Sequence, residues 1–188
     1  MMVSNTNKVK RWSIGGFFFI VLLGVLYHYL YEWSHKCVLI GAITPVNESV
    51  WEHLKLGLWA VISFSVVEYF ALGKEINNYF FSKAVGVLLI SCTILLIFYT
   101  YTTFLNRTIL WVDISSYIIG VLVCQLFCYK VFQLKHSNRL NIWGVLLLIT
   151  FCVLFAVYTF YPPRLEIFKD HNSNTYGIET KTTDYNKK

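Results

Sequence analysis

The run that decides the fold lies at residues 141–161 and reads NIWGVLLLITFCVLFAVYTFY. It holds 21 residues without a single charge, whereas strands in globular proteins usually have fewer than about ten residues. About 20 mostly apolar residues in a helix cross the ~30 Å hydrocarbon core of a bilayer. The run is therefore predicted to be a membrane-spanning helix. Pro162 and Pro163 end it, because neither residue can continue a helix.

The composition of the whole chain is also typical of a membrane protein. The 188 residues are 56% hydrophobic and 18% aromatic, and only 14% of them are charged. Soluble domains carry roughly 25% charged residues, so this chain has about half the charge that a water-facing surface needs. The deficit argues against a soluble enzyme, a disordered chain and a nucleic-acid-binding protein, although the net charge is +6. The expected environment is a lipid bilayer, and no nucleic acid is expected as a partner.

Four further apolar runs predict an all-α bundle of five transmembrane helices. We expect spans at residues 13–33, 45–73, 79–105, 112–132 and 141–161. Thr44 and Pro45 are typical of a helix start, whereas the apolar piece at 37–43 is too short to cross a membrane. The basic residues before the first run resemble the start of a signal peptide. No cleavage site of small residues follows them, so we expect the first helix to be retained.

The distribution of Lys and Arg predicts the orientation of the bundle. If the N-terminus is inside, the inner segments hold Lys8, Lys10, Arg11, Lys74, Lys83, Lys130, Lys135 and Arg139, and the outer segments hold Lys36, Lys55, Arg107, Arg164 and Lys169. Positive charge favours the inner side, so we expect the N-terminus inside and the C-terminal tail outside. Residues 1–178 are predicted to form one transmembrane domain. Within it, apolar residues at 165–168 favour a tail segment, 162–178, that folds back over the outer face, and residues 179–188 are predicted to be disordered.

This topology brings acids and imidazoles from distant parts of the sequence to the outer side. A charged residue at membrane depth is costly and usually faces a partner or a wet cavity. Neutral imidazole and carboxylate groups suit Zn²⁺ and other divalent ions. We therefore predict a divalent metal such as Zn²⁺, held by residues at the outer ends of the first, second and fourth helices: His28, Glu32, Glu52, His53 and Asp113. Glu68 lies toward the inner side, within reach of Lys74, and is not part of this site.

A second set of polar and aromatic residues is predicted to bind a ligand at the same side. Its members are Asn47, Glu48, Trp51, Lys55, Arg164 and Asp170. Glu48 and Glu52 are one helical turn apart, and two like charges at that spacing favour a cation or a shared proton between them. Simpler interpretations stay open, because Lys55 could neutralise these acids without a metal and Trp51 is typical of a membrane-interface anchor.

Three stretches together resemble a known family. They are HYLYEW at 28–33, PVNESVWEHLK at 45–55, and PPRLEIFKD at 162–170 followed by YGI at 176–178. The chain resembles, over nearly its whole length, a family of small multi-pass membrane proteins of unknown function found mostly in low-GC Gram-positive bacteria, in which the Asn-Glu-Ser-x-Trp-Glu-His segment is specific. The resemblance implies a location in the bacterial cytoplasmic (inner) membrane. It implies no activity.

The sequence leaves three functions open and does not decide whether the protein is an enzyme. The first is a binding or accessory module that holds a cation, a small polar or lipid-like head group, or a segment of a partner. The second is a metal-dependent membrane hydrolase that acts at the outer leaflet, with one carboxylate activating a metal-bound water. The third and least supported is a transporter, because the middle of the spans has few polar groups apart from Gln125.

Overall fold

The structure, a computed structural model, describes residues 6–73 and 75–178. Its elements in chain order are α1 (Thr6–Trp33), α2 (Val38–Gly41), α3 (Val50–Leu72), α4 (Tyr79–Leu105), α5 (Leu110–Phe132), α6 (Asn138–Phe160), the 3₁₀ turn η1 (Glu166–Phe168), and the strands β1 (Lys169–Asp170) and β2 (Thr175–Tyr176). Five of these helices are long and apolar enough to cross a membrane, which confirms the predicted all-α bundle with five spans. The tail predicted to be disordered, residues 179–188, lies outside the described residues, as does Lys74.

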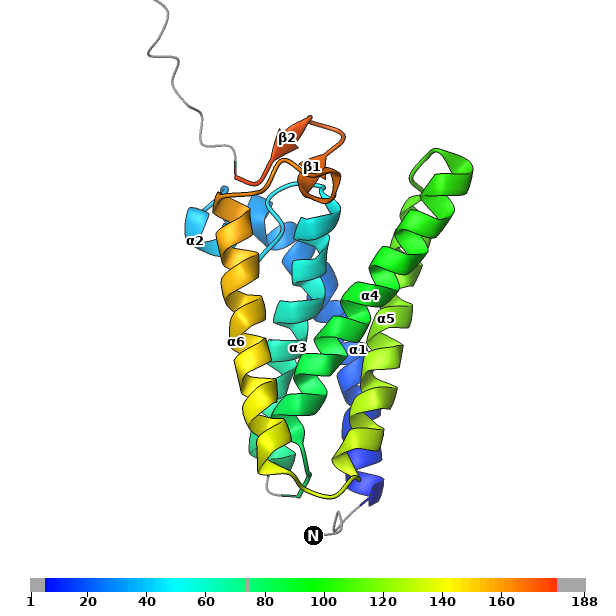
Figure 1. Ribbon diagram of the computed structural model, residues 1–188, viewed down its shortest axis with the longest axis vertical. Helices are drawn as coiled ribbons and strands as arrows, with labels where there is room; N and C mark the ends of the chain where they lie inside the picture. Colours follow the sequence, from blue (N-terminus) through cyan, green and yellow to red (C-terminus); the bar gives the residue numbers. More distant parts are fainter. Residues whose placement is uncertain (1–5, 74, 179–188) are drawn as a thin grey trace, which may run out of the picture.

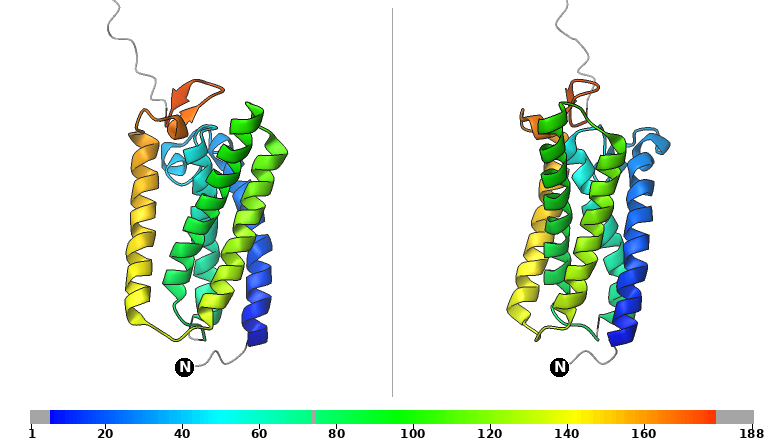
Figure 2. Two further views of the ribbon diagram at one scale, coloured as in Figure 1. Left: turned by 45° about the vertical axis from the view of Figure 1, so that its right-hand side comes forward. Right: turned by 90° about the vertical axis from the view of Figure 1, so that its right-hand side faces the viewer.

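The five long helices run side by side and alternate in direction (Figure 1). One end of the bundle holds the start of α1 and the connections from α3 to α4 and from α5 to α6; we call it the N-terminal end. The other end holds α2, the connection from α4 to α5, and residues 161–178; we call it the tail end. Figure 2 shows α6 and α1 on opposite sides of the bundle. Helix α4 packs against both α5 and α6, and α1 packs against α3 and α5.

The second span begins later than we predicted. We expected its start at Pro45, but α3 begins at Val50, and the Ser49 hydroxyl caps it by accepting a hydrogen bond from the Glu52 N–H at 3.4 Å. The Glu52 carboxylate in turn accepts a hydrogen bond from the Val46 N–H at 3.0 Å. The prediction at Pro45 was wrong because the Ser49 hydroxyl satisfies a free N–H of the first turn, and the Glu52 side chain ties the preceding loop back at Val46.

Other boundaries differ by less. Helix α1 begins at Thr6 rather than at residue 13, and α5 begins at Leu110 rather than at 112. Helix α6 spans Asn138–Phe160 instead of 141–161, because the Ser137 hydroxyl caps it by accepting from the Leu140 N–H. The apolar piece at 37–43 contains the short helix α2. None of these shifts changes the number of spans.

Close contact between α4 and α6 depends on a glycine. A Cβ on Gly144 of α6 would lie 2.2 Å from the Phe81 backbone nitrogen of α4, far closer than any real carbon contact. Small residues let membrane helices approach until their backbones touch, which increases the van der Waals contact that holds them together. Gly144 is therefore the point that fixes α6 against the rest of the bundle.

Residues 162–178 lie over the tail ends of α3 and α6 (Figure 1). The Ile178 N–H donates a hydrogen bond to the Thr159 carbonyl at 3.0 Å, and the Asn47 side-chain amide donates to the Gly177 carbonyl at 3.1 Å. Just before these anchored residues, β1 and β2 pair as an antiparallel hairpin with two residues in each strand. This hairpin is connected to the bundle at both α6 and the loop that precedes α3.

Candidate functional site

Two imidazoles and a carboxylate meet at the tail end of the bundle. His28 comes from α1, His53 from the first turn of α3, and Glu48 from the loop just before α3. One potential ligand atom of each residue lies within 4.8 Å of the other two. The two imidazole rings are 5.3 Å apart between centroids, and both histidines are half-buried whereas Glu48 is exposed. Three side chains of the types that can bind a metal, one from α1 and two from the start of α3, therefore lie close together.

The orientation of the His53 ring is set by the backbone. Its Nδ1 lies 2.9 Å from the Ser49 carbonyl oxygen, so the proton of a neutral ring is held on Nδ1. The other ring nitrogen, Nε2, lies 3.3 Å from Oε2 of Glu48. Metal-binding histidines usually donate one ring N–H to a carbonyl or carboxylate, and this leaves the lone pair of the other nitrogen free to bind the ion. The Ser49 carbonyl holds Nδ1 of His53 in this way, and a cation bound at Nε2 would replace the hydrogen bond that Nε2 now makes with Glu48.

Electrostatics keep Glu48 ionised. The hydrogen bond with His53 lowers the pKa of the Glu48 carboxyl below its ordinary value, and this effect outweighs burial, which raises the pKa. The positive potential of His53 and His28 lowers it further, while Asp170 opposes them. At neutral pH Glu48 is therefore a carboxylate, which is the form that binds a cation.

Next to this cluster, Glu52 and Lys55 form a buried ion pair instead of joining it. Lys55 Nζ lies 2.6 Å from Oε2 of Glu52, and the side chains are 0% and 1% exposed, respectively. Lys55 also donates to the Gly41 carbonyl and to the Thr159 hydroxyl, each at 2.8 Å. The same Thr159 hydroxyl lies 3.1 Å from Oε1 of Glu52 and donates to it. Both oxygens of Glu52 are thus already engaged, Oε1 by Thr159 and Oε2 by Lys55 and the Val46 N–H.

The aromatic ring of Trp51 lies under the tail. It stacks on Phe155 of α6 at 4.5 Å between centroids and contacts Phe168 of η1 at 4.7 Å. Aromatic contacts of this kind stabilise a packed interface beyond the area that they bury. The ring of Trp51 is therefore part of the hydrophobic contact between α3, α6 and the tail.

The remaining predicted site residues have partners of their own. Glu32 is exposed and pairs with Lys36 at 3.5 Å, and the Arg164 guanidinium lies over the Tyr176 ring at 4.6 Å. Asp170 accepts hydrogen bonds from the Asn172 N–H and the Ser173 hydroxyl inside the hairpin. These three residues stabilise the surface and the tail.

Asp113 lies beside the cluster of His28, Glu48 and His53 without belonging to it. It accepts a hydrogen bond from the Tyr101 hydroxyl at 2.6 Å, and it lies close enough to His53 for the two charges to interact. Its helix, α5, is neither of the helices that carry His28 and His53. Asp113 is thus a neighbour of the cluster, with one carboxylate oxygen engaged by Tyr101.

The structure brings together only some of the residues that the sequence assigned to one site. Of the five expected metal ligands, the structure brings together His28 and His53, and it adds Glu48, which we had assigned to a different ligand. Neutralisation of the acids by Lys55 was one of the two interpretations that the sequence left open, and the structure shows Lys55 paired with Glu52. Thr159 was missed, because its contact joins residues 104 positions apart in sequence and no local pattern reports such a contact.

Comparison with known proteins identifies the family. The family of unknown function DUF6512 matches residues 1–178, so the chain belongs to that family. No curated protein and no solved structure matches the chain.

Proposed function

We propose that this multi-pass membrane protein binds a divalent transition metal ion, with Zn²⁺ the best fit, at His28, Glu48 and His53. The observation that carries the proposal is the approach of three ligand atoms to within 4.8 Å of one another, together with the His53 ring held by the Ser49 carbonyl. We further propose that the tail end faces the exterior, in agreement with the excess of Lys and Arg at the N-terminal end.

The donor set suits zinc. Imidazole nitrogen and carboxylate oxygen are common zinc ligands at about 2.0–2.2 Å, which in a tetrahedral site puts the ligand atoms about 3.3 Å apart. The pair of His53 and Glu48 already has that separation. Closure of the site then requires the ligand atom of His28, which lies within 4.8 Å of the other two, to approach them to about 3.3 Å.

A metal-dependent hydrolase is the second candidate. Three protein ligands leave the fourth position of a tetrahedral ion for water, as in catalytic zinc sites, and the carboxylate of Asp113 lies near His53. In this function Asp113 would accept the proton of the metal-bound water. Hydrolysis of an ester substrate by the wild type, lost in Asp113→Asn while zinc stays bound, would favour this candidate over a binding protein.

Zinc binding by the purified protein tests the first proposal. We expect one Zn²⁺ per chain in a calorimetric titration of the detergent-solubilised protein, and loss of that binding in His28→Ala and His53→Ala. His136→Ala is the matched control, because His136 is an exposed histidine at the opposite end of the bundle and its removal should leave binding unchanged. No stoichiometric binding by the wild type, or equal loss in all three variants, would overturn the proposal.

A further inference from the structure

The N-terminal end of the bundle carries an excess of positive charge without protein partners. Within the described residues, five basic side chains at this end have no carboxylate within 4.0 Å: Lys10, Arg11, Lys130, Lys135 and Arg139. The two described carboxylates there are engaged, since Glu68 pairs with Lys83 and Glu75 pairs with Lys8. These five cations are thus not paired with a carboxylate of the described residues and are available to anions from outside the chain.

One of these cations begins an apolar stripe that follows α1. Lys10, Ile14, Phe18 and Leu22 are spaced four residues apart, so they lie on one face of the helix. The three apolar members are 52%, 60% and 69% exposed, whereas the buried residues of α1, such as Val9, Ser13 and Ile20, lie on another face. From Lys10 to Leu22 the helix rises about 18 Å, which is close to the thickness of one leaflet of hydrocarbon, about 15 Å.

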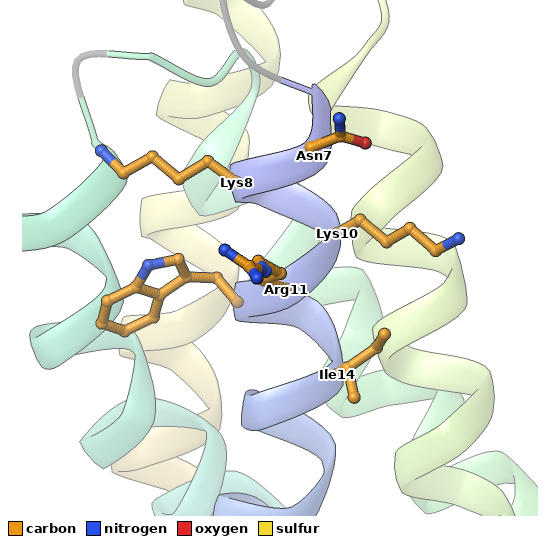
Figure 3. A pocket seen from close by; sticks show the side chains of 6 residues that line it. Asn7, Lys8, Lys10, Arg11 and Ile14 are labelled. Atoms are coloured by element: carbon orange, nitrogen blue, oxygen red, sulfur yellow. The ribbon is translucent and has the colours of Figure 1, made fainter.

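Polar donors surround the charged end of the stripe. Figure 3 shows that Asn7, Lys10 and Arg11 project in different directions from the first turns of α1, with Ile14 one turn further along the helix. Together with Lys8 and Trp12 they line an open hollow. All six side chains that line this hollow belong to the first turns of α1, so it is an open surface beside the helix and not an enclosed cavity. The Trp12 ring, which also lines it, lies 6.3 Å from Phe64 between centroids. Tryptophan is enriched at this depth because its ring suits the boundary between head groups and hydrocarbon.

We propose that this face of α1 binds one phospholipid with an anionic head group, with the phosphate at Lys10 and Arg11 and an acyl chain along Ile14, Phe18 and Leu22. Along α1 the amide of Asn7, the cations and the apolar stripe follow one another in the order of a polar head group, its phosphate and an acyl chain. A water-soluble phosphate would use only the upper part of this surface, and a zwitterionic lipid would bring its own positive charge to Lys10 and Arg11. The site is at the opposite end of the bundle from His28, Glu48 and His53, so it is independent of metal binding.

Native mass spectrometry of the detergent-solubilised protein with added phosphatidylglycerol tests the proposal. Basic residues near a membrane surface each contribute about 1 kcal/mol to attraction of anionic lipid, so loss of two lowers the affinity by about 25-fold. We expect that decrease in Lys10→Gln/Arg11→Gln. The matched control is Lys135→Gln/Arg139→Gln, which removes the same charge at the same end and should change affinity by less than about threefold. Elution as a monodisperse species with unchanged helical content verifies that each variant is folded.

A second pair of variants tests the apolar part. Phe18→Ala should lower the affinity for phosphatidylglycerol, whereas Phe104→Ala, at an 80% exposed position of α4, should not. Equal loss in the two double variants would mean diffuse attraction and would overturn the proposal. So would equal affinity for phosphatidylcholine, or displacement of the bound lipid by millimolar glycerol phosphate.

Discussion

Lys83 Nζ of α4 lies 2.5 Å from Oε2 of Glu68 in α3, and the two side chains are only 2% and 0% exposed. The ammonium group also lies 5.3 Å from the centroids of three rings, those of Phe64, Tyr79 and Phe132. Aromatic faces attract a cation, more strongly where water is excluded. The pair thus connects α3 to α4 within the membrane-spanning part of the bundle, where an unpaired charge is costly.

Removal of one partner of this pair should destabilise the protein more than removal of both. Lys83→Met leaves Glu68 buried without its counterion, and such a loss typically costs about 3–5 kcal/mol. Glu68→Leu/Lys83→Met removes both charges and should recover most of that loss. Thermal unfolding in detergent, followed by circular dichroism, measures the difference. Lys130→Met, at an exposed position of α5, controls for loss of a positive charge, and a double variant as unstable as the single one would contradict the prediction.

We expect the Thr159 hydroxyl to stabilise the folded protein through its hydrogen bonds and not through the space that it fills. It joins Lys55 to Glu52 inside the tail end of the bundle. Thr159→Val keeps the shape but leaves both charged groups short of a partner, so we expect a loss of about 1–3 kcal/mol in the free energy of unfolding. Thr159→Ser retains the hydroxyl and should lose less, and chemical denaturation compares the two variants. A serine variant that is less stable than the valine variant would mean that packing dominates at this position.

The sequence predicted the five spans well because each membrane helix can be recognised from its own apolar residues. An uncharged run such as 141–161 needs no partner to be recognised as a membrane helix, whereas the pairing of charges depends on how helices pack. Lys83 illustrates the difference: by position along the chain it counts as an inner positive charge, yet it is buried against Glu68. For Glu68 we had expected a position within reach of Lys74, which lies outside the described residues.

The same reasoning explains the outcome at the candidate site. His28 and His53, which the sequence assigns to one site because each lies near an acid at the end of a predicted span, lie close together in the structure. Glu52 was assigned to the metal because its contacts with Thr159 and with the Val46 N–H depend on where α6 and the preceding loop lie. Glu48 and Glu52, alike in sequence, are separated by the helix start at Ser49: one is left in the loop beside the imidazoles, and the other is buried in the bundle.

Gly177 should control the docking of the tail. Its φ is +55°, a conformation that L side chains rarely adopt, and a Cβ there would lie 2.3 Å from the Thr159 carbonyl oxygen. Gly177→Ala should therefore release residues 162–178 from α6 and expose them to protease. Gly15→Ala is the control, because a Cβ at Gly15 meets nothing within 4 Å. Limited trypsin digestion should cut the tail of the Gly177 variant faster; equal rates in both variants would show that the tail tolerates the side chain.

The docked tail should loosen in acid because of Asp170. Burial raises the pKa of this carboxyl, but hydrogen bonds from the Ser173 hydroxyl and the Asn172 N–H outweigh burial and hold the pKa below its ordinary value. The ionised form therefore stabilises the folded hairpin. This contribution is complete above the ordinary pKa of about 3.9 and is lost as the pH falls through the lower, folded value.

Hydrogen exchange of the tail amides, compared at each pH with a peptide of the same sequence, measures this stabilisation. We expect wild-type protection to be constant from neutral pH down to about pH 4 and to fall below it. Asp170→Asn cannot ionise, so its tail should be less protected at neutral pH and should change less in acid. The Glu48 carboxyl, whose pKa is also lowered, remains in this variant, and Glu48→Gln measures its share. A wild-type tail as protected at pH 2 as at pH 7 would mean that the aromatic contact between Trp51 and Phe168 holds the tail without help from the carboxylate.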